Sequence, residues 1–419
     1  MSGLVLVNAE RLTTTLRALA RFGLNEDGGV DRASFSSADR QARTWLTSWC
    51  EEQGLQVAVD GIGNMIVSSP ELERGIADRA PVWSGSHIDA VPNGGRYDGP
   101  LGVLAAIECL TRLQEEEVSL ERPVRAVVYA DEEGNYAHLL GSSALARGFT
   151  VDELSALVGR DGDRFADTFT AAGGDLLAAA RVRLPQGSIH ASVELHIEQG
   201  PVLEREGLDV ANVTGIVAIG GGTLRFLGRA DHAGTTPMDG RQDAVLAMAD
   251  FVTRLPGLAR EVGDTSVVTT GIVKVWPGGS NVVAKMAEVV VDYRDPSTEK
   301  AAALGDLIAS AAQDAAHRRG LQVESHVEPL IPAAPLHETV RQAIQASVQA
   351  HGYSSRDLPS GAGHDSQNLA TLAPTGMIFV PSVDGRSHSP AELTHDADVV
   401  RGANVLLGTL MRLAAAPTA

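Results

Sequence analysis

Residues 82–113 read VWSGSHIDAVPNGGRYDGPLGVLAAIECLTRL, and this stretch decides the fold. Residues 82–86 have the pattern of a short buried strand, and residues 101–113 have the apolar periodicity of a helix. The polar loop between them contains several glycines together with a histidine and two aspartates. A strand that leads through such a loop into a helix is the repeating unit of an α/β sheet.

The same alternation continues on both sides of this stretch. β-branched and apolar runs predict buried strands, and amphipathic stretches between them predict helices. The expected strands are residues 55–60, 124–130, 192–197 and 375–380, and the expected helices are residues 9–20, 41–53 and 336–351. We therefore predict an α/β domain with a mixed sheet and helices on both of its faces.

The pattern changes after about residue 212. From there it reads strand 213–228, helix 244–254, strands 265–275 and 287–294, helix 300–318 and strand 321–328. This order is the split βαβ arrangement of a ferredoxin-like α+β sandwich. We expect an inserted domain, residues 213–329, that interrupts an α/β domain made of residues 1–212 and 330–419.

The composition excludes several classes of protein. The chain has 419 residues and a net charge of −19, so it has no general attraction for nucleic acids or anionic membranes. An anionic substrate would need locally placed cations. We expect neither nucleic acid nor a membrane among the partners of this chain.

Cysteine content and the chain start favour a reducing compartment. There are two cysteines, Cys50 and Cys109, without the spacing of a disulfide framework or a metal site. The apolar run at residues 4–7 lacks the basic region of a signal peptide, and no apolar stretch is long enough to span a bilayer. We expect a cytoplasmic protein.

Histidine and carboxylate side chains recur where the expected strands end, a region that forms the binding crevice of open α/β sheets. Imidazole and carboxylate together suit Zn²⁺, Mn²⁺ or Co²⁺. Taken singly, each has a simpler interpretation as a hydrogen-bonded histidine or a solvated turn. The indication of a metal site comes from their joint occurrence: His87, Asp89, Asp98, Glu132, Glu133, His196 and His388.

The order of these segments resembles that of the hydantoinase/carbamoylase family of amidases. This family lies within the wider superfamily of co-catalytic metal aminoacylases and carboxypeptidases. The resemblance runs nearly end to end, through residues 22–23, 60–64, 85–102, 194–202, 232–238, 360–369 and 375–390. It implies a metallohydrolase fold whose inserted domain serves for dimerisation or as a lid.

The resemblance also implies the metal centre. Two divalent ions per subunit (Zn²⁺, Mn²⁺ or Co²⁺) would be held by five ligands, with Asp98 as the bridge: His87, Asp98, Glu133, His196 and His388. Such a pair of ions can activate a water and polarise the scissile carbonyl. The resemblance makes Glu132 the general base, although it could act only as a support to the ligands. Asp89 would orient His87.

Substrate contacts follow from the same resemblance. Gln199, three residues after His196, has an amide that could hydrogen-bond a ureido group. In relatives, the substrate is held by residues of the inserted domain that match three residues of this chain: His232, Asn281 and Arg294. Arg294 is a suitable carboxylate clamp, but it could instead be a surface arginine paired to a nearby acid. Gly361, Ala362 and Gly363 could bring backbone amides to a ligand or form a flexible turn.

The expected activity is hydrolysis of an N-carbamoyl-L-amino acid, and a homodimer through the inserted domain is expected. β-Ureidopropionate, allantoate or ureidoglycolate-type acids and N-acyl amino acids are alternatives, and a non-catalytic metal-binding protein on the same fold is a different class. Two departures bear on the substrate. Residues 220–222 are glycines where the allantoate-hydrolysing branch carries a basic pair, and residues 135–138 form a shorter loop than in relatives.

Overall fold

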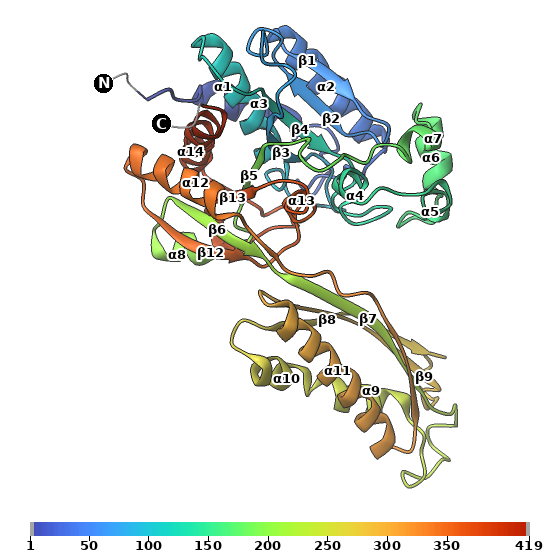
Figure 1. Ribbon diagram of the computed structural model, residues 1–419. Coiled ribbons are helices and arrows are strands. Elements are labelled where there is room, and N and C mark those ends of the chain that lie inside the picture. The colour runs from blue at the N-terminus through green and yellow to red at the C-terminus, as the bar shows by residue number, and fades with distance from the viewer. Residues whose placement is uncertain (1–3, 416–419) are drawn as a thin grey trace. The chain divides into compact units, whose positions relative to one another are not determined.

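The computed structural model describes residues 4–415, which fold into two compact units (Figure 1). Unit 1 consists of a segment ending at Thr214, a segment from Pro335 to Leu358, and a segment beginning at His364. Unit 2 comprises Gly215–Ala334 and Pro359–Gly363. It extends past the expected boundary at residue 329. The chain ends included in the expected segments, residues 1–3 and 416–419, lie outside the described residues.

A nine-stranded mixed sheet forms the centre of unit 1. Its order is β1-β2-β4-β3-β5-β13-β6-β11, and β12 also pairs with β6. The four strands β4, β3, β5 and β13 are mutually parallel, whereas β1, β2 and β6 run antiparallel to their neighbours. The strands are β1 (Gln56–Val59), β2 (Met65–Ser68), β3 (Val82–His87), β4 (Val124–Tyr129), β5 (Ala191–Ile197), β6 (Val210–Ile216), β11 (Ala334–Pro335), β12 (Ser355–Ser360) and β13 (Thr375–Val380).

Helices cover both faces of this sheet, so the predicted α/β class is confirmed. Strand β4 shows why: Ala126 and Val128 join one hydrophobic core, and Val127 and Tyr129 join another on the opposite face. The first core is covered by α1 (Ala9–Leu19), α2 (Ser37–Glu52), α3 (Pro100–Glu115), α12 (Glu338–His351) and α14 (Asp396–Ala414). The second lies under α4 (Leu140–Ala146) and α13 (Asp365–Leu369).

The prediction of a single continuous strand at residues 213–228 is wrong. The chain forms two strands there, β6 and β7 (Ala218–Leu227), interrupted at Val217. The reason is tertiary, because β6 pairs with β13 in the large sheet while β7 pairs with β9 and β10 in a second sheet. Short helices were not expected either: α5 (Val151–Ala156), α6 (Phe165–Ala171), α7 (Leu176–Ala179) and α8 (Val202–Glu206).

Unit 2 is a four-stranded antiparallel sheet covered by helices on one face. Its strand order is β10-β7-β9-β8, the order of a ferredoxin-like split βαβ fold. Ala287, Val289, Val291 and Tyr293 alternate along β9 and pack under the helices. Besides β7, the elements are α9 (Ala244–Val252), α10 (Leu255–Val262), β8 (Val267–Trp276), β9 (Met286–Asp295), α11 (Thr298–Arg318) and β10 (Gln322–Val327).

Packing against Tyr293 explains Gly220 of β7. A β-carbon on Gly220 would come within 2.3 Å of the Tyr293 ring, and one on Gly305 in α11 would come within 2.5 Å of the Tyr293 hydroxyl. Tyr293 therefore occupies the space that side chains at both positions would need. Gly220 therefore has a structural role in the core of unit 2.

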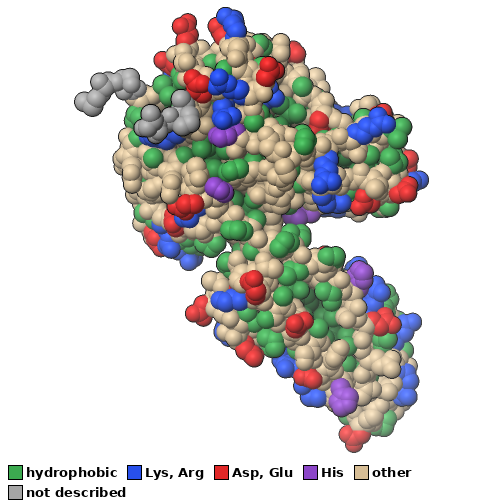
Figure 2. All heavy atoms as spheres, viewed as in Figure 1, with side chains coloured by type: hydrophobic (Ala, Val, Ile, Leu, Met, Phe, Trp, Pro, Cys, Tyr) green, Lys and Arg blue, Asp and Glu red, His purple; other side chains and the backbone are tan. Residues whose placement is uncertain are grey.

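On the visible face of each unit, acidic and basic side chains are interspersed (Figure 2). Within residues 4–415, no helix combines the length and apolarity that crossing a membrane requires.

Candidate active site

The candidate site lies where parallel strands of the large sheet end. His87 is the last residue of β3 and is in register with Tyr129, the last residue of β4. His196 lies in β5 and is in register with Phe379 of β13. The loops that leave β4 and β13 carry Glu132, Glu133 and His388. Neighbouring parallel strands thus deliver all these side chains to one edge of the sheet, as their positions in the sequence predict.

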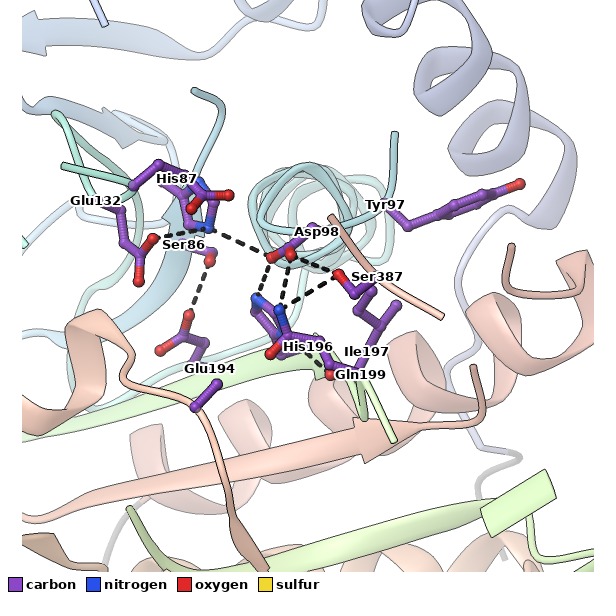
Figure 3. Close-up of polar contacts among 12 residues, drawn as sticks. Ser86, His87, Tyr97, Asp98, Glu132, Glu194, His196, Ile197, Gln199 and Ser387 are labelled. Atoms are coloured by element: carbon purple, nitrogen blue, oxygen red, sulfur yellow. Dashed lines mark hydrogen bonds and ion pairs between the residues drawn. The ribbon is translucent and has the colours of Figure 1, made fainter. Parts of the chain in front are cut away.

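Asp98 is the centre of this group (Figure 3). Its Oδ1 lies 3.1 Å from His196 Nε2 and 3.7 Å from His87 Nε2. Its Oδ2 lies 3.2 Å from His388 Nε2, and His388 Nε2 lies 3.6 Å from Glu133 Oε1. The donor atoms therefore form two groups that share Asp98: His87, Asp98 and His196 on one side, and Asp98, Glu133 and His388 on the other.

Backbone carbonyls fix the orientation of two histidines. The Nδ1 atoms of His87 and His196 lie 3.0 Å and 2.9 Å from the carbonyl oxygens of Asp89 and Ile197. Each Nδ1 must donate its proton to that oxygen, so each Nε2 offers a lone pair toward Asp98. This arrangement is typical of imidazoles that bind a metal.

The Asp89 carboxylate supports the loop after β4. It accepts hydrogen bonds from the backbone N–H groups of Glu132 (3.4 Å) and Glu133 (3.1 Å), and Oδ1 lies 3.7 Å from His87 Nδ1. The expected orientation of His87 by Asp89 therefore involves mainly the Asp89 carbonyl group. The carboxylate itself holds the two adjacent glutamates in place.

Buried negative charge dominates the site. Burial would raise the pKa of Asp98, but the three histidines beside it, His196, His388 and His87, hold it well below its ordinary value. Burial raises the pKa of Glu133 to about 7, and it raises the pKa of Glu132 well above its ordinary value. Closely spaced buried carboxylates that resist ionisation need cations nearby.

The residues fit divalent metal ions. Glu133 Oε1 and His196 Nε2 are buried and have no hydrogen-bond partner among the described residues. Buried polar atoms without a partner are costly unless something else binds them. Imidazole nitrogens and carboxylate oxygens within a few ångströms of one another are the ligands that Zn²⁺, Mn²⁺ or Co²⁺ takes in proteins.

Glu132 lies beside the donor groups. Its side chain is 7% exposed, and Oε2 lies 3.5 Å from His87 Nε2. Glu132 and Glu133 are adjacent in sequence but approach different histidines, His87 and His388. The turn between β4 and α4 thus directs two neighbouring carboxylates toward two sides of the centre.

Glu392 is a buried residue that sequence reasoning missed. Its Oε1 accepts the backbone N–H groups of Tyr97 (2.7 Å) and Asp98 (3.1 Å), and its Oε2 accepts the Ser387 hydroxyl (2.8 Å). Ser387 Oγ also lies 2.8 Å from Asp98 Oδ2. Glu392 therefore ties the Asp98 loop to the loop that carries His388. Its position in the sequence gives no sign of the contact with Tyr97 and Asp98, because folding brings together segments 294 residues or more apart.

Asp131 is a second residue that the sequence did not reveal. Its carboxylate accepts backbone N–H groups from Asn135, Tyr136 and Ala137 at 2.8, 2.9 and 3.0 Å. These bonds close the short turn that follows Glu132 and Glu133. Asp131 itself has a positive φ of 54°. Left-handed backbone in a non-glycine residue costs about 1–2 kcal/mol, so the hydrogen bonds hold a strained turn in place.

Gln199 lies against the metal centre. Its Nε2 donates to Asp98 Oδ2 at 2.7 Å, and its backbone has a positive φ of 57°. Its Oε1 is buried and has no hydrogen-bond partner among the described residues. The residue predicted to meet a ureido group thus contacts a candidate ligand through one end of its amide and keeps the oxygen end available.

His232 and Asn281 lie side by side in unit 2. His232 forms a bridge with Val282, and the backbone N–H of Ala233 donates to the Asn281 carbonyl at 2.9 Å. His232 Nδ1 accepts the N–H groups of Gly234 and Thr235 at 3.1 and 3.2 Å. A neutral imidazole in this arrangement carries its proton on Nε2, so the exposed face of His232 is a hydrogen-bond donor.

Arg294 and Gly361 also meet within unit 2. Arg294 Nη1 donates to the Gly361 carbonyl at 3.0 Å. The same guanidinium binds Asp292, with Nε–Oδ1 at 2.9 Å and Nη2–Oδ2 at 3.2 Å. Arg294 is therefore paired to a local acid, the simpler of the two interpretations above. Its role as a carboxylate clamp stays a prediction, as do the roles of Gly361, Ala362 and Gly363.

Fold and site together define a hydrolase of mixed α/β architecture with a candidate centre for metal ions. The family model "Peptidase family M20/M25/M40" matches residues 83–412, and the chain belongs to this family of metal-dependent hydrolases. The N-carbamoyl-L-amino acid amidohydrolase of Geobacillus stearothermophilus is 39% identical over 413 residues, which is 98% of this chain and 99% of that protein. The predicted resemblance to carbamoylases is thereby confirmed.

Other relatives have related activities. The allantoate amidohydrolase of Escherichia coli (strain K12) is 32% identical over 419 residues, covering 97% of this chain and 98% of that protein. Among solved structures, a hydantoinase/carbamoylase family amidase from Burkholderia vietnamiensis superposes over 100% of both chains, with a TM-score of 0.89 and 31% identity.

Proposed function

We propose that the chain is a two-metal amidohydrolase that converts an N-carbamoyl-L-amino acid and water to the amino acid, carbon dioxide and ammonia. The observation that carries this proposal is the division of donors into two groups that share Asp98, with Glu132 beside them. The full-length similarity to a protein named N-carbamoyl-L-amino acid amidohydrolase supports the choice of substrate.

In this proposal, His87, Asp98 and His196 would hold one divalent ion, and Asp98, Glu133 and His388 would hold the other. Each Asp98 oxygen faces a different group, which suits a bridging carboxylate. A bound pair of Zn²⁺, Mn²⁺ or Co²⁺ ions supplies activation of a water nucleophile and polarisation of the scissile carbonyl.

Glu132 supplies the proton transfers. Its carboxylate is buried, and its pKa is raised by that burial, so it can accept a proton from the attacking water and pass it to the leaving nitrogen. The Nε2–H of His232 is a suitable donor to the oxygen that gains charge during attack. The Gln199 oxygen would accept from the carbamoyl NH₂ group, and Arg294 and Asn281 would hold the rest of the substrate.

The structure of unit 2 bears on the choice between carbamoyl amino acids and allantoate. At residues 220–222 the allantoate-hydrolysing branch has a basic pair, and here Tyr293 fills the space beside Gly220. An arginine there would have to displace Tyr293 from the core. This position therefore contributes none of the basic contacts expected in the allantoate-hydrolysing branch, which counts against allantoate as the substrate.

We also propose a homodimer that pairs through the β8 edge of unit 2. This edge strand exposes Val267 (54%), Ile272 (47%), Val273 (50%) and Val275 (37%). An exposed apolar edge strand is a template for pairing with another chain.

The cysteines bear on the compartment. Cys50 and Cys109 are buried and unpaired, which supports the proposal that the protein functions in the reducing cytoplasm.

The test is ammonia release by metal-reconstituted protein. The panel contains N-carbamoyl-L-amino acids, their D-enantiomers, N-carbamoyl-β-alanine and allantoate, with amino-acid release from N-acetyl amino acids measured in parallel. We expect turnover of an N-carbamoyl-L-amino acid that a Glu132→Gln variant lacks. Turnover of allantoate or of an N-acyl acid alone would overturn the proposed substrate. No turnover of any compound with both metals bound would favour a non-catalytic protein.

A further inference from the structure

Unit 1 contains a cavity of about 210 Å³ that lies outside the group of metal donors. It is smaller than the ~300–1,000 Å³ of sites for drug-sized molecules, so it suits a small ligand. The cavity is lined by three arginines (Arg17, Arg21 and Arg96), Asp396, Tyr97, one threonine and three apolar side chains. In a chain with a net charge of −19, such a local excess of cations is notable.

Two segments of unit 1 bring these arginines together. Arg17 lies in α1, Arg21 follows the end of that helix, and Arg96 lies in the loop before Asp98. Arg17 forms an ion pair with Asp396, the first residue of α14. Arg96 gives one N–H to the Gly28 carbonyl at 2.9 Å. Within residues 4–415, neither Arg21 nor Arg96 has an ion-pair partner, so guanidinium donors remain for a ligand.

Tyr97 separates this cavity from the metal centre. Figure 3 shows its ring directed away from His87, Asp98 and His196. Burial and the nearby Asp396 carboxylate raise the pKa of Tyr97, and Arg96 and Arg17 offset part of that shift, so both acidic and basic groups lie near the phenol. The cavity and the metal donors are thus on opposite sides of one short loop.

The apolar part of the lining decides the kind of anion. Leu16 and Ala20 are buried, and Leu24 is 52% exposed at the cavity. The guanidinium group of an arginine can donate two parallel hydrogen bonds to the two oxygens of a carboxylate. The leucine side chains favour a short hydrocarbon group attached to that carboxylate. We propose that this cavity binds a small organic carboxylate with an apolar side chain, at a site separate from the metal centre.

Substitutions at two positions can test this site without touching the metal ligands. Arg21→Gln removes a cation that forms no ion pair in the structure, and Arg181→Gln is its matched control at another exposed arginine. Leu24→Glu places a carboxylate at the cavity, and Leu24→Gln is the neutral control for it. Because Leu24 and Arg21 are exposed, we expect all these variants to fold.

The measurement is calorimetric titration of the metal-loaded protein with isovalerate, isovaleramide and inorganic phosphate. We expect saturable 1:1 binding of isovalerate, weakened at least about tenfold in Arg21→Gln and lost in Leu24→Glu, with both controls like the unmodified protein. Isovaleramide should bind at least about tenfold more weakly. Equal binding in all variants would assign isovalerate to the metal centre and overturn the proposal. Binding of phosphate alone, or of neither anion, would also overturn it.

Discussion

Gly99 lies directly against His87. A β-carbon built on Gly99 would come within 2.5 Å of His87 Cε1, and the backbone of Gly99 has a positive φ of 81°. Both facts exclude a side chain at this position. The residue after the proposed bridging ligand therefore sets the space available to the first histidine.

We expect Gly99→Ala to displace His87 and to lower metal content and activity together. Gly75→Ala is a matched control, because Gly75 has a φ of 80° and open space around it. The two variants thus share the backbone strain but differ in the clash. Metal content by mass spectrometry and thermal unfolding would be measured for both. If Gly99→Ala retained full metal content, the contact with His87 would be unimportant for binding.

The set of candidate metal donors was expected from the family resemblance, and their convergence at one edge of the sheet was expected from the local sequence pattern. His87, Glu133 and His196 lie at or just after β-branched or apolar runs, and parallel strands end at a common edge. The residues that hold these donors in place could not be predicted in the same way. Glu392 acts on Asp98 across 294 residues of chain, and nothing near Glu392 in the sequence indicates that contact.

The fold likewise has elements that the sequence predicts and elements that it does not. The helix α3 and the buried apolar strand β13 were predicted to within two residues, since their own side chains determine them. The break between β6 and β7 was not, because strand propensity continues through Val217 while the pairing partner changes. The short helices α5 to α7 depend on packing around Phe165 and Phe169, which no periodicity of so few residues reveals.

Glu132→Gln should retain both metal ions and lose turnover. The amide keeps the shape of the side chain but cannot accept the proton, so kcat should fall about 10²- to 10⁴-fold. Metal content and kcat would be measured on the same preparation. Because Glu132 also lies within reach of His87 and Glu133, loss of metal in this variant would make it a ligand instead. Near-normal kcat would rule out the general-base role.

Glu392 should tune metal affinity without touching the metals. In Glu392→Leu, the backbone N–H groups of Tyr97 and Asp98 lose their acceptor, so we expect metal affinity to fall about 10- to 100-fold. Glu392→Gln keeps one acceptor oxygen and should lose less. Competition with a chelator would give the dissociation constants. Equal metal affinity in both variants and the unmodified protein would limit Glu392 to a packing role.

Removal of the metals should destabilise the protein more at pH 8 than at pH 6. Burial raises the pKa of Glu133 to about 7 in the folded chain, whereas an unfolded glutamate titrates near 4.3. A group with a raised folded pKa favours folding at low pH, and this contribution is lost as pH rises through about 7. Bound cations would offset that loss by pairing with the ionised carboxylate.

Thermal unfolding with and without chelator, at both pH values, would measure this effect. The difference in Tm between the two forms should be larger at pH 8, and Glu133→Gln should reduce its pH dependence. A difference in Tm that is the same at both pH values would contradict the assignment of ionised Glu133 to the metal centre.

Arg294→Ala distinguishes a substrate clamp from a surface ion pair. If Arg294 leaves Asp292 to bind the substrate carboxylate, its loss should raise KM about 10- to 100-fold with little change in kcat. Such an increase corresponds to charged hydrogen bonds worth about 1.5–3 kcal/mol. Asp292→Asn is the matched control: it frees the guanidinium, so KM should stay the same or fall. Steady-state kinetics with an N-carbamoyl-L-amino acid would measure both. An unchanged KM in Arg294→Ala would mean that the bond to Asp292 is the whole role of this arginine.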